Sequence, residues 1–498
     1  MTSDLRYKEF GVVKSVCGCV VNVLNLKNCF LGQLVRFGYG TEGIIMGFNP
    51  DSAMVLVVKQ NEPLSAGTKV EATLEPFNMP TGEKFMGRVV NPLGEALDGQ
   101  GDIEPDEMLP YFAKGPGIMD RNPVVVTIET GVKMVDTMLP LGHGQRSLIM
   151  GDKMMGKTTI GTDIILNQKG RNVICIYCAI GKPRATLSRV INLLSQNGCL
   201  DYTIVCSAGA NTSPGQQYLA PYAACSLGEY FMKRGKRVFV LFDDFTKHAW
   251  SYRELSLLMG VPPGRDSYPG DVFYLHSRMI ERAAQLNDKL GNGSMTFIAI
   301  VELLEGDLTA YVPTNLVSMT DGQIVLNTTS FNEGFRPALD IGLSVSRIGT
   351  KVQWKAMKDV SKSMRLEYIQ YKELLRISKL STGGISVETQ EKLDSGKLLT
   401  SLIVQGPNVP VDYVRQIMVF FVRNEKLLKG LTPEQGGLFV ENILEYAEQH
   451  DHGLVAELRS KKDLKDDLKQ RITKVAQILI DDIKQGSVQK ASPVGAAN

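Results

Sequence analysis

The first part of the chain alternates short apolar runs with glycine, asparagine and proline. The apolar runs cover residues 18–24, 33–37, 43–48 and 53–58. Closely spaced strands that are separated by turn residues are typical of small antiparallel barrels. We therefore predict an N-terminal β-barrel over residues 1–74.

Between residues 75 and 354, apolar segments of strand length alternate with segments of helical spacing. The candidate strands are residues 173–180, 203–206, 237–242, 295–301 and 323–326. Continuous apolar runs are typical of strands buried on both faces, and their alternation with helices indicates a mostly parallel sheet with helices on both faces. The predicted fold class of this domain is therefore α/β.

Beyond residue 354 the strand signals largely stop. Residues 413–428 have helical spacing. An amphipathic helix is indicated by apolar residues that recur every three or four positions, namely Leu464, Leu468, Ile472, Val475, Leu479 and Ile483. We predict a C-terminal α-helical bundle over residues 355–498, whose small and polar end, residues 485–498, is expected to fray.

A glycine-rich loop lies inside the α/β region, directly after the apolar residues 148–150 and before a segment of helical spacing. It consists of Gly151, Asp152, Lys153, Met154, Met155, Gly156, Lys157 and Thr158, a full Walker A sequence. In this motif, backbone N–H groups and a helix N-terminus bind phosphate oxygens, the lysine reaches the β- and γ-phosphates, and the hydroxyl ligates Mg²⁺. We predict a P-loop (RecA-like) core that binds ATP or ADP through these eight residues, with Mg²⁺ at Thr158.

Two carboxylates follow the apolar run 237–242. Ligands of parallel sheets collect at the carboxyl ends of the strands. Asp243 is therefore predicted to hold Mg²⁺ through water, with Asp244 beside it. The alternative is that these aspartates only cap the next helix.

Composition limits the partners that the chain is expected to have. With 55 basic and 53 acidic residues among 498, the net charge is only +2, which gives no electrostatic indication of a nucleic-acid partner. No stretch approaches the roughly 20 apolar residues of a membrane-spanning helix, and the first ten residues lack the pattern of a signal or presequence. We expect a soluble chain that is not exported.

Eight cysteines in so long a chain do not indicate a disulfide framework. Cys175 and Cys178 have C-x-x-C spacing, but residues three apart on a strand face opposite sides and do not easily share a metal. We predict that these two cysteines, and likewise Cys17 and Cys19, pack in the core.

Several sequence blocks resemble the alpha subunits of rotary F-type ATP synthases, in the same order along the chain. The matching blocks are residues 87–99, 217–222, 262–265, 268–282, 311–324 and 342–349. The resemblance implies a ring of three alpha and three beta chains around a central shaft (gamma) subunit, with catalytic sites on the beta chains. It also implies attachment to a membrane ion-translocating sector, on the cytoplasmic (or matrix or stromal) side. The coupling ion and the favoured direction, synthesis or hydrolysis, stay open.

The resemblance assigns Arg347, in the sequence Leu-Ser-Val-Ser-Arg, the role of an arginine finger in the catalytic site of the neighbouring beta chain. A guanidinium placed against the developing phosphoryl charge is worth on the order of a thousandfold or more in rate. Ser344 is expected near the same interface. The alternative is an ordinary structural arginine.

Lys182 stands where beta chains have the glutamate that polarises the attacking water and where alpha chains usually have glutamine. A lysine is cationic at neutral pH and has no lone pair with which to accept a proton. The resemblance therefore implies a non-catalytic, regulatory site of low or no hydrolytic activity. In the alternative reading, Lys182 is a solvated loop charge and the alignment is off by one.

The residues that are expected near the adenine ring match the family pattern only in part. Phe331, Arg336 and Pro337 match the family pattern, and Gln405 aligns with the first of two family glutamines, whereas Pro407 replaces the second. The resemblance implies nucleotide contacts by Arg336 and Gln405, but leaves occupancy and base selectivity open. In the loop, residues 153–155 replace the usual Arg-Gln-Thr. The barrel also begins soon after the first residue, where relatives commonly have a stator-binding helix, so stator contact is uncertain.

Two other classes share such a core. A hexameric RNA translocase would need a nucleic-acid surface that the balanced charge does not indicate. A homohexameric flagellar or secretion-type export ATPase would need its own glutamate base and would hydrolyse ATP without a second chain type. Activity of the isolated chain distinguishes the export ATPase from the synthase subunit.

Overall fold

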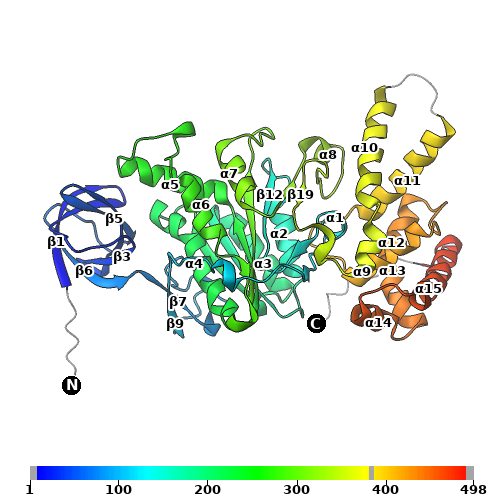
Figure 1. Cartoon of the computed structure of the whole chain (residues 1–498), viewed down its shortest axis with the longest axis horizontal. Coiled ribbons are helices and arrows are strands. Elements are labelled where there is room, and N and C mark those ends of the chain that lie inside the picture. The colour runs from blue at the N-terminus through cyan, green and yellow to red at the C-terminus, as the bar shows by residue number, and fades with distance from the viewer. Residues whose placement is uncertain (1–7, 381–385, 489–498) are drawn as a thin grey trace. The chain divides into compact units, whose positions relative to one another are not determined.

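The computed structural model describes residues 8–380 and 386–488 (Figure 1). Contacts divide the chain into two compact units. Unit 1 comprises the chain up to Pro123, Gly144–Leu148 and Gly170–Thr320, and unit 2 comprises Val124–His143, Ile149–Lys169 and the chain from Asp321 onward. Of the end that is predicted to fray, residues 485–498, residues 489–498 lie outside the described residues.

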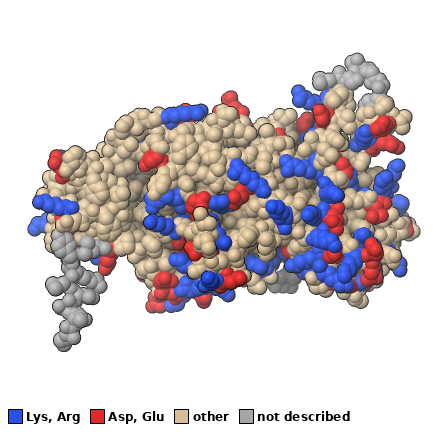
Figure 2. All heavy atoms as spheres, viewed as in Figure 1, with Lys and Arg blue, Asp and Glu red and all other residues tan. Residues whose placement is uncertain are grey.

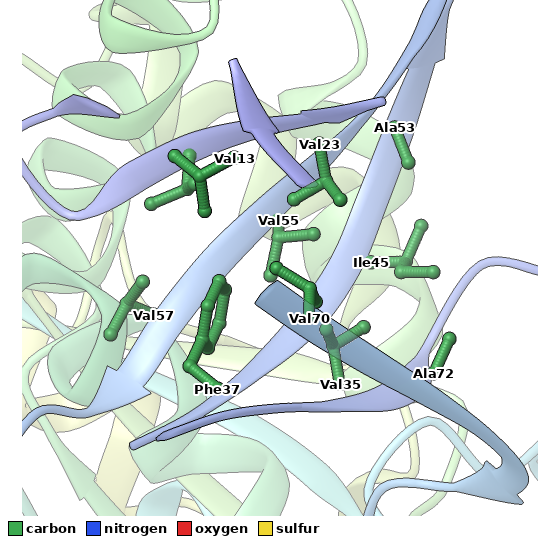
Figure 3. Packing of buried hydrophobic residues seen from close by; sticks show 11 residues of the cluster. Val13, Val23, Val35, Phe37, Ile45, Ala53, Val55, Val57, Val70 and Ala72 are labelled. Atoms are coloured by element: carbon green, nitrogen blue, oxygen red, sulfur yellow. The ribbon is translucent and has the colours of Figure 1, made fainter. Parts of the chain in front are cut away.

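Unit 1 begins with a closed barrel of six strands in the order β1-β2-β5-β4-β3-β6 (blue in Figure 1). The strands are β1 (Lys8–Cys17), β2 (Val20–Leu24), β3 (Gln33–Phe37), β4 (Glu42–Asn49), β5 (Ser52–Lys59) and β6 (Lys69–Pro76). Small β-branched side chains such as Val23, Val35 and Val55 are fully buried in its interior (Figure 3). The N-terminal barrel is confirmed. The predicted domain boundary at residue 74 falls inside β6.

The rest of unit 1 is built on parallel strands in the order β17-β15-β13-β14-β8. Its strands are β7 (Asn78–Thr81), β8 (Val89–Val90), β9 (Glu107–Pro110), β13 (Val173–Lys182), β14 (Thr203–Gly209), β15 (Arg237–Asp243), β16 (Ala284–Gln285) and β17 (Ser294–Glu302). Its helices are α3 (Arg184–Gln196), α4 (Pro214–Met232), α5 (Phe245–Leu258), α6 (Val272–Ile280) and α7 (Tyr311–Met319). The helix α4 packs against β13, β14 and β15, and α5 packs against β13 and β17. The predicted α/β alternation is confirmed.

Unit 2 contains the phosphate loop and the elements next to it, and the described helices that follow Asp321. The strand β12 (Arg146–Gly151) carries the chain from unit 1 into it. The other elements are β10 (Thr127–Ile128), α1 (Lys133–Met138), β11 (Leu141–Gly142), α2 (Lys157–Leu166), β18 (Gly322–Val325), α8 (Thr328–Asn332) and β19 (Val345–Ser346). The C-terminal helices are α9 (Lys355–Ser361), α10 (Met364–Leu380), α11 (Val387–Ile403), α12 (Tyr413–Asn424), α13 (Pro433–His450), α14 (Leu454–Lys461) and α15 (Asp466–Gln485).

The C-terminal helices pack through their apolar faces, as the sequence pattern predicts. In Figure 1, α10 and α11 lie side by side, and α13 packs against α11, α12 and α15. On α15, Leu468, Ile472 and Leu479 are fully buried. The helical domain is therefore confirmed, and the periodicity of α15 correctly identified its buried face.

The surface charges and the apolar content of the helices agree with what the composition indicates. On the face shown in Figure 2, acidic and basic side chains are interspersed. Within residues 8–380 and 386–488, no helix is both long enough and apolar enough to cross a membrane.

The cysteines correct one prediction and confirm another. Cys175 and Cys178 are completely buried on β13, as predicted. Cys17 is exposed at the end of β1 and Cys19 is only half-buried, so the prediction that these two pack in the core is wrong. Cys17 precedes the turn between β1 and β2 and Cys19 lies in it, and a turn at a strand end faces solvent whatever the polarity of its residues.

Candidate functional site

The phosphate loop of unit 2 joins β12 to α2. Gly156 is the residue before α2 and has φ +92°, a left-handed conformation that L side chains rarely adopt. At Gly151, a Cβ atom would lie 2.8 Å from the Cβ of Leu326, so only glycine fits this close approach. The two glycines of the motif are thus explained by backbone geometry.

Lys157, the first residue of α2, is buried and folds over the loop. Its Nζ donates hydrogen bonds to the carbonyl oxygens of Gly151 (2.8 Å) and Asp152 (2.5 Å). Both acceptors are neutral main-chain groups. The side chain of Asp152 accepts a hydrogen bond from the Thr328 hydroxyl at 2.6 Å, which ties the loop to the start of α8.

A cavity of about 290 Å³ adjoins the loop within unit 2. Its wall includes Met154, Met155, Gly156, Asp163, Phe331, Arg336, Pro337, Gln405 and Pro407. The Arg336 guanidinium lies 3.6 Å from the centre of the Phe331 ring and donates hydrogen bonds to the carbonyl oxygens of Phe331 and Phe335. The structure therefore brings together the loop and the predicted adenine-side residues around one space.

Gln405 lines this cavity, but its side-chain amide is used within the fold. Its Oε1 accepts a hydrogen bond from the Lys133 amide at 3.0 Å, and its Nε2 donates to the carbonyl oxygens of Gly131 and Val409, both at 2.8 Å. An amide has two donor hydrogens, so Gln405 fixes the cavity wall with all of its donors. Its predicted contact with a nucleotide stays a prediction.

Asp163 is a cavity residue that sequence reasoning missed. It lies on α2, six residues after Lys157, and its Oδ1 accepts a hydrogen bond from the Asn408 amide at 2.9 Å. Burial raises the pKa of Asp163 to about 7. The available signal was a carboxylate among the apolar residues of a helix that follows a phosphate loop.

In unit 1, the two aspartates and Lys182 meet at the ends of neighbouring strands. Parallel pairing of β13 with β15 places Ala179 opposite Asp243, and Lys182 is the last residue of β13. Its Nζ lies 2.6 Å from Oδ1 of Asp243 and 3.2 Å from Oδ2 of Asp244. The carboxylates are almost completely buried and the lysine side chain is 18% exposed, so the alternative of a solvated loop charge is wrong.

Further contacts fix the acidic pair. The Tyr177 hydroxyl donates a hydrogen bond to Oδ2 of Asp243 at 2.9 Å. Asp244 accepts a hydrogen bond from the Lys247 amide at 2.8 Å and so caps α5, in addition to its contact with Lys182. Sequence reasoning missed the contact of Tyr177 with Asp243.

Electrostatics keep Lys182 charged. Burial by itself lowers the pKa of Lys182, but the charges of Asp243 and Asp244, with their hydrogen bonds, outweigh burial and raise it above its usual value. Burial also raises the pKa of Asp244, against the effect of Lys182. A cationic lysine cannot act as a general base.

Arg347 is exposed and directly follows β19 in unit 2. Its amide donates a hydrogen bond to the Asp321 carbonyl at 2.8 Å. Arg365, on α10, donates to the carbonyl oxygens of Ile341 (3.0 Å) and Ser344 (2.9 Å). Buried Ser344 accepts a hydrogen bond from the Val325 amide at 2.9 Å. Arg365, which sequence reasoning missed, therefore braces the segment that presents Arg347.

Comparisons with known proteins agree with this arrangement. The family model "ATP synthase alpha/beta family, nucleotide-binding domain" matches residues 131–346, and the model "ATP synthase alpha/beta chain, C terminal domain" matches residues 353–479. The chain is 40% identical over 488 residues to an ATP synthase subunit alpha of Clostridium botulinum, which covers 98% of this chain and 96% of the relative. The chain belongs to the ATP synthase alpha/beta family.

Two further relatives are also named ATP synthase subunit alpha. The ATP synthase subunit alpha of Petrotoga mobilis is 42% identical over 469 residues, which are 93% of either chain, and that of Clostridium kluyveri is 41% identical over 464 residues, 93% of this chain and 92% of the relative. Within the family, this chain is similar to alpha subunits. Membership agrees with the phosphate loop of unit 2 and with the order along the chain of barrel, α/β core and helical bundle.

Proposed function

We propose that this chain is the non-catalytic, regulatory alpha subunit of an F-type rotary ATP synthase, and that it binds ATP or ADP without hydrolysing it. The observation that carries the proposal is the pairing of Lys182 with Asp243 and Asp244. The ammonium holds the position that the resemblance assigns to a catalytic glutamate, and its raised pKa leaves it without a lone pair at neutral pH. The nucleotide would be bound by the loop residues 151–158, with Arg336 and Gln405 on the adenine side.

The proposal includes partners that the names of the relatives suggest. The chain would alternate with three beta chains around a gamma shaft and associate peripherally with a membrane sector that moves ions. Arg347 would act in trans, in the catalytic site of the adjacent beta chain. Its exposed position and the bracing of its segment by Arg365 support this role, because a guanidinium that stabilises a transition state has to be both accessible and positioned.

Reconstitution with a beta-type partner tests this proposal. The isolated chain is expected to hydrolyse ATP no faster than a blank, and the mixed ring is expected to turn over. In the ring, Arg347→Ala should lower turnover on the order of a thousandfold while assembly and nucleotide binding by this chain change little. Turnover is followed by phosphate release and assembly by size-exclusion chromatography.

Two variants serve as controls. Lys351→Ala removes an exposed charge four residues from Arg347 and should leave turnover unchanged. Arg347→Lys keeps the charge but loses the planar guanidinium group, which can donate two parallel hydrogen bonds, so an intermediate rate is expected. Rapid ATP hydrolysis by the isolated chain would instead support the homohexameric export ATPase, and an Arg347→Ala ring with wild-type turnover would disprove the arginine finger.

A further inference from the structure

The cavity beside the phosphate loop extends along one face of α2, within unit 2. Its wall on this side includes Gly156, Thr159, Ile160 and Asp163. Residues three or four apart on a helix are neighbours on the same face. Asp163 is six residues beyond Lys157, which corresponds to about 9 Å along the helix axis at a rise of about 1.5 Å per residue. A nucleotide whose phosphates are bound at the loop would therefore extend its base toward Asp163.

The residues expected near the base offer few side-chain hydrogen-bond donors. Gln405 uses both hydrogens of its amide for main-chain carbonyl oxygens. Pro407 has neither an N–H group nor a polar side chain. The Arg336 guanidinium lies 3.6 Å from the centre of the Phe331 ring and donates to two further carbonyl oxygens. A base at this end of the cavity would thus find no free donor on Gln405 or Pro407.

Asp163 has one open oxygen in this wall. The residue is only 5% exposed, and its Oδ1 accepts the hydrogen bond from the Asn408 amide at 2.9 Å. Within residues 8–380 and 386–488, its Oδ2 has no hydrogen-bond partner. A buried polar atom without a partner costs free energy, so a ligand group that forms a hydrogen bond with Oδ2 would be bound favourably.

The surroundings of Asp163 favour its neutral form. Burial raises the pKa of this carboxyl to about 7, although the Asn408 amide lowers it, and neither influence is a neighbouring charge. A base that fills the cavity would displace the remaining water, and the ligand's phosphates are negative, so both would disfavour the carboxylate further. In the neutral form, one carboxyl oxygen becomes an O–H donor.

Charged groups on the elements around Asp163 are engaged with other partners. Lys133, the first residue of α1, donates hydrogen bonds to two carbonyl oxygens at the end of α11. Asp136 accepts the hydrogen bond of a threonine hydroxyl, and Asp412 is paired with Arg459. Burial lowers the pKa of Lys133 to about 7 and raises that of Asp136 to about 6, so a test by pH has to separate Asp163 from these two groups.

We propose that Asp163 contacts the nucleobase as a neutral carboxylic acid and donates a hydrogen bond from Oδ2 to a ring nitrogen of adenine, so that nucleotide binding is coupled to the uptake of one proton. The inference rests on the proposed nucleotide-binding function and identifies a side chain that recognises the base. Adenine suits such a donor because its unprotonated ring nitrogens are acceptors.

The first test measures the dissociation constant of ATP for the full-length chain by equilibrium dialysis at pH 6, 7 and 8, in excess Mg²⁺. Asp163→Asn keeps an acceptor for the Asn408 amide and a donor for the base, but does not titrate. Relative to this variant, the wild-type affinity should be equal within about threefold at pH 6 and about tenfold weaker at pH 8. Comparing the two chains at each pH cancels the titration of ATP, Lys133 and Asp136.

Two further variants are controls for this measurement. Asp163→Leu removes the charge without supplying a donor, so it should bind ATP about tenfold more weakly than Asp163→Asn at every pH. Asp481→Asn, an exposed change on α15, should follow the wild-type chain across the pH range.

The second test counts protons by isothermal titration calorimetry at pH 8, in HEPES and in Tris, two buffers whose ionisation enthalpies differ. A carboxyl with a pKa of about 7 is about nine-tenths deprotonated at this pH. The wild-type chain should therefore take up about 0.9 more protons per bound ATP than Asp163→Asn.

The third test identifies the acceptor on the base. 1-Deaza-ATP, 3-deaza-ATP and 7-deaza-ATP each replace one ring nitrogen of adenine by a C–H group. At pH 6, the wild-type chain should bind one of the three about tenfold more weakly than ATP. Asp163→Leu should bind all three about as tightly as it binds ATP.

The outcomes separate this inference from the proposed function. If ATP binds but the affinity ratio of the wild-type chain to Asp163→Asn stays constant from pH 6 to pH 8, or no extra proton is taken up, the inference is overturned and nucleotide binding stands. Equal affinities of Asp163→Leu and Asp163→Asn, or wild-type binding of all three analogues as tight as that of ATP, show that Asp163 donates no hydrogen bond to the base. Failure of the wild-type chain and every variant to bind ATP at any pH overturns the nucleotide-binding proposal, and this inference with it.

Discussion

Two lysines of this chain, Lys157 in unit 2 and Lys182 in unit 1, use the same ammonium group in different ways. Lys157 donates its hydrogen bonds to neutral main-chain carbonyls of the phosphate loop. Lys182 is bound to two carboxylates. An anionic ligand can displace these two neutral acceptors of Lys157 more easily than it could displace a carboxylate. The charge of Lys182 is already matched, and an anion would have to compete with two buried carboxylates.

The comparison shows that the partners of a lysine, more than its burial, decide whether it is available to a ligand. Both side chains are largely buried, with residual exposures of 8% for residue Lys157 and 18% for the side chain of Lys182. We therefore expect loss of Lys157 to affect ligand binding and loss of Lys182 to affect stability.

The largest effect, a loss in the free energy of unfolding, is expected from Lys182→Met. Removing one partner of a buried ion pair leaves carboxylates without a counter-ion and typically costs about 3–5 kcal/mol. The free energy of unfolding of unit 1 is measured by urea denaturation in a Trp354→Phe background, where Trp250 on α5 reports on the helix that Asp244 caps. Adding Asp244→Asn should restore part of the loss. Equal stability of Lys182→Met and wild type would contradict the ion-pair interpretation.

The next effect is on ligand binding. Lys157→Ala should weaken ATP binding by about a hundredfold, which corresponds to about 2.7 kcal/mol, because the loop loses its cation for the phosphates. The unfolding midpoint should move much less than in Lys182→Met, since two hydrogen bonds of Lys157 have neutral carbonyl acceptors. Lys169→Ala, at an exposed position just after α2, is the control for a general loss of charge. Binding within threefold of wild type would show that the loop does not hold the phosphates.

The smallest effect is expected from Asp163, a buried carboxylate whose hydrogen bond comes from a neutral amide. Its folded-state pKa of about 7 lies above the unfolded value of 3.8, so the folded chain binds more protons between these values. Stability should therefore fall as the pH rises from about 4 to about 7, with a slope of at most about 1.4 kcal/mol per pH unit.

Asp163→Asn removes this dependence and keeps an acceptor for the Asn408 amide. The variant should gain stability over wild type from pH 5 to pH 8, by about 1–2 kcal/mol at the upper end. Urea unfolding in a Trp250→Phe background, with Trp354 as the probe of unit 2, measures the difference. Asp481→Asn, an exposed change on α15, should track wild type at every pH. Parallel pH profiles for Asp163→Asn and wild type would rule out a buried, cation-free carboxylate.

Most of the fold could be predicted because its signals are local. Apolar runs between turn residues identified four barrel strands, and the spacing of Leu468, Ile472 and Leu479 identified the buried face of α15. The same local reasoning failed for Cys17 and Cys19, because a side chain at a surface turn has fewer neighbours that bury it. Residues 151–158 were found because the backbone geometry of a phosphate loop requires glycine at fixed positions.

The candidate site was predictable only in its parts. Asp163 was missed because nothing in the sequence shows that residues near position 405 fold over α2. For Gln405, sequence reasoning did not show that its amide is bound to the carbonyl oxygens of Gly131 and Val409. Contacts between segments hundreds of residues apart leave no periodic signal in the sequence.

The sequence by itself determined the phosphate loop, the order of barrel, α/β core and helices, and the presence of Lys182 where the resemblance implies a glutamate or a glutamine. Only the tertiary structure decided what that lysine does. Lys182 and Asp243 are 61 residues apart in the chain, and they meet because β13 and β15 pair in parallel register. The behaviour of a charged group depends on the charges and the solvent around it, and for Lys182 those surroundings exist only after the sheet has formed.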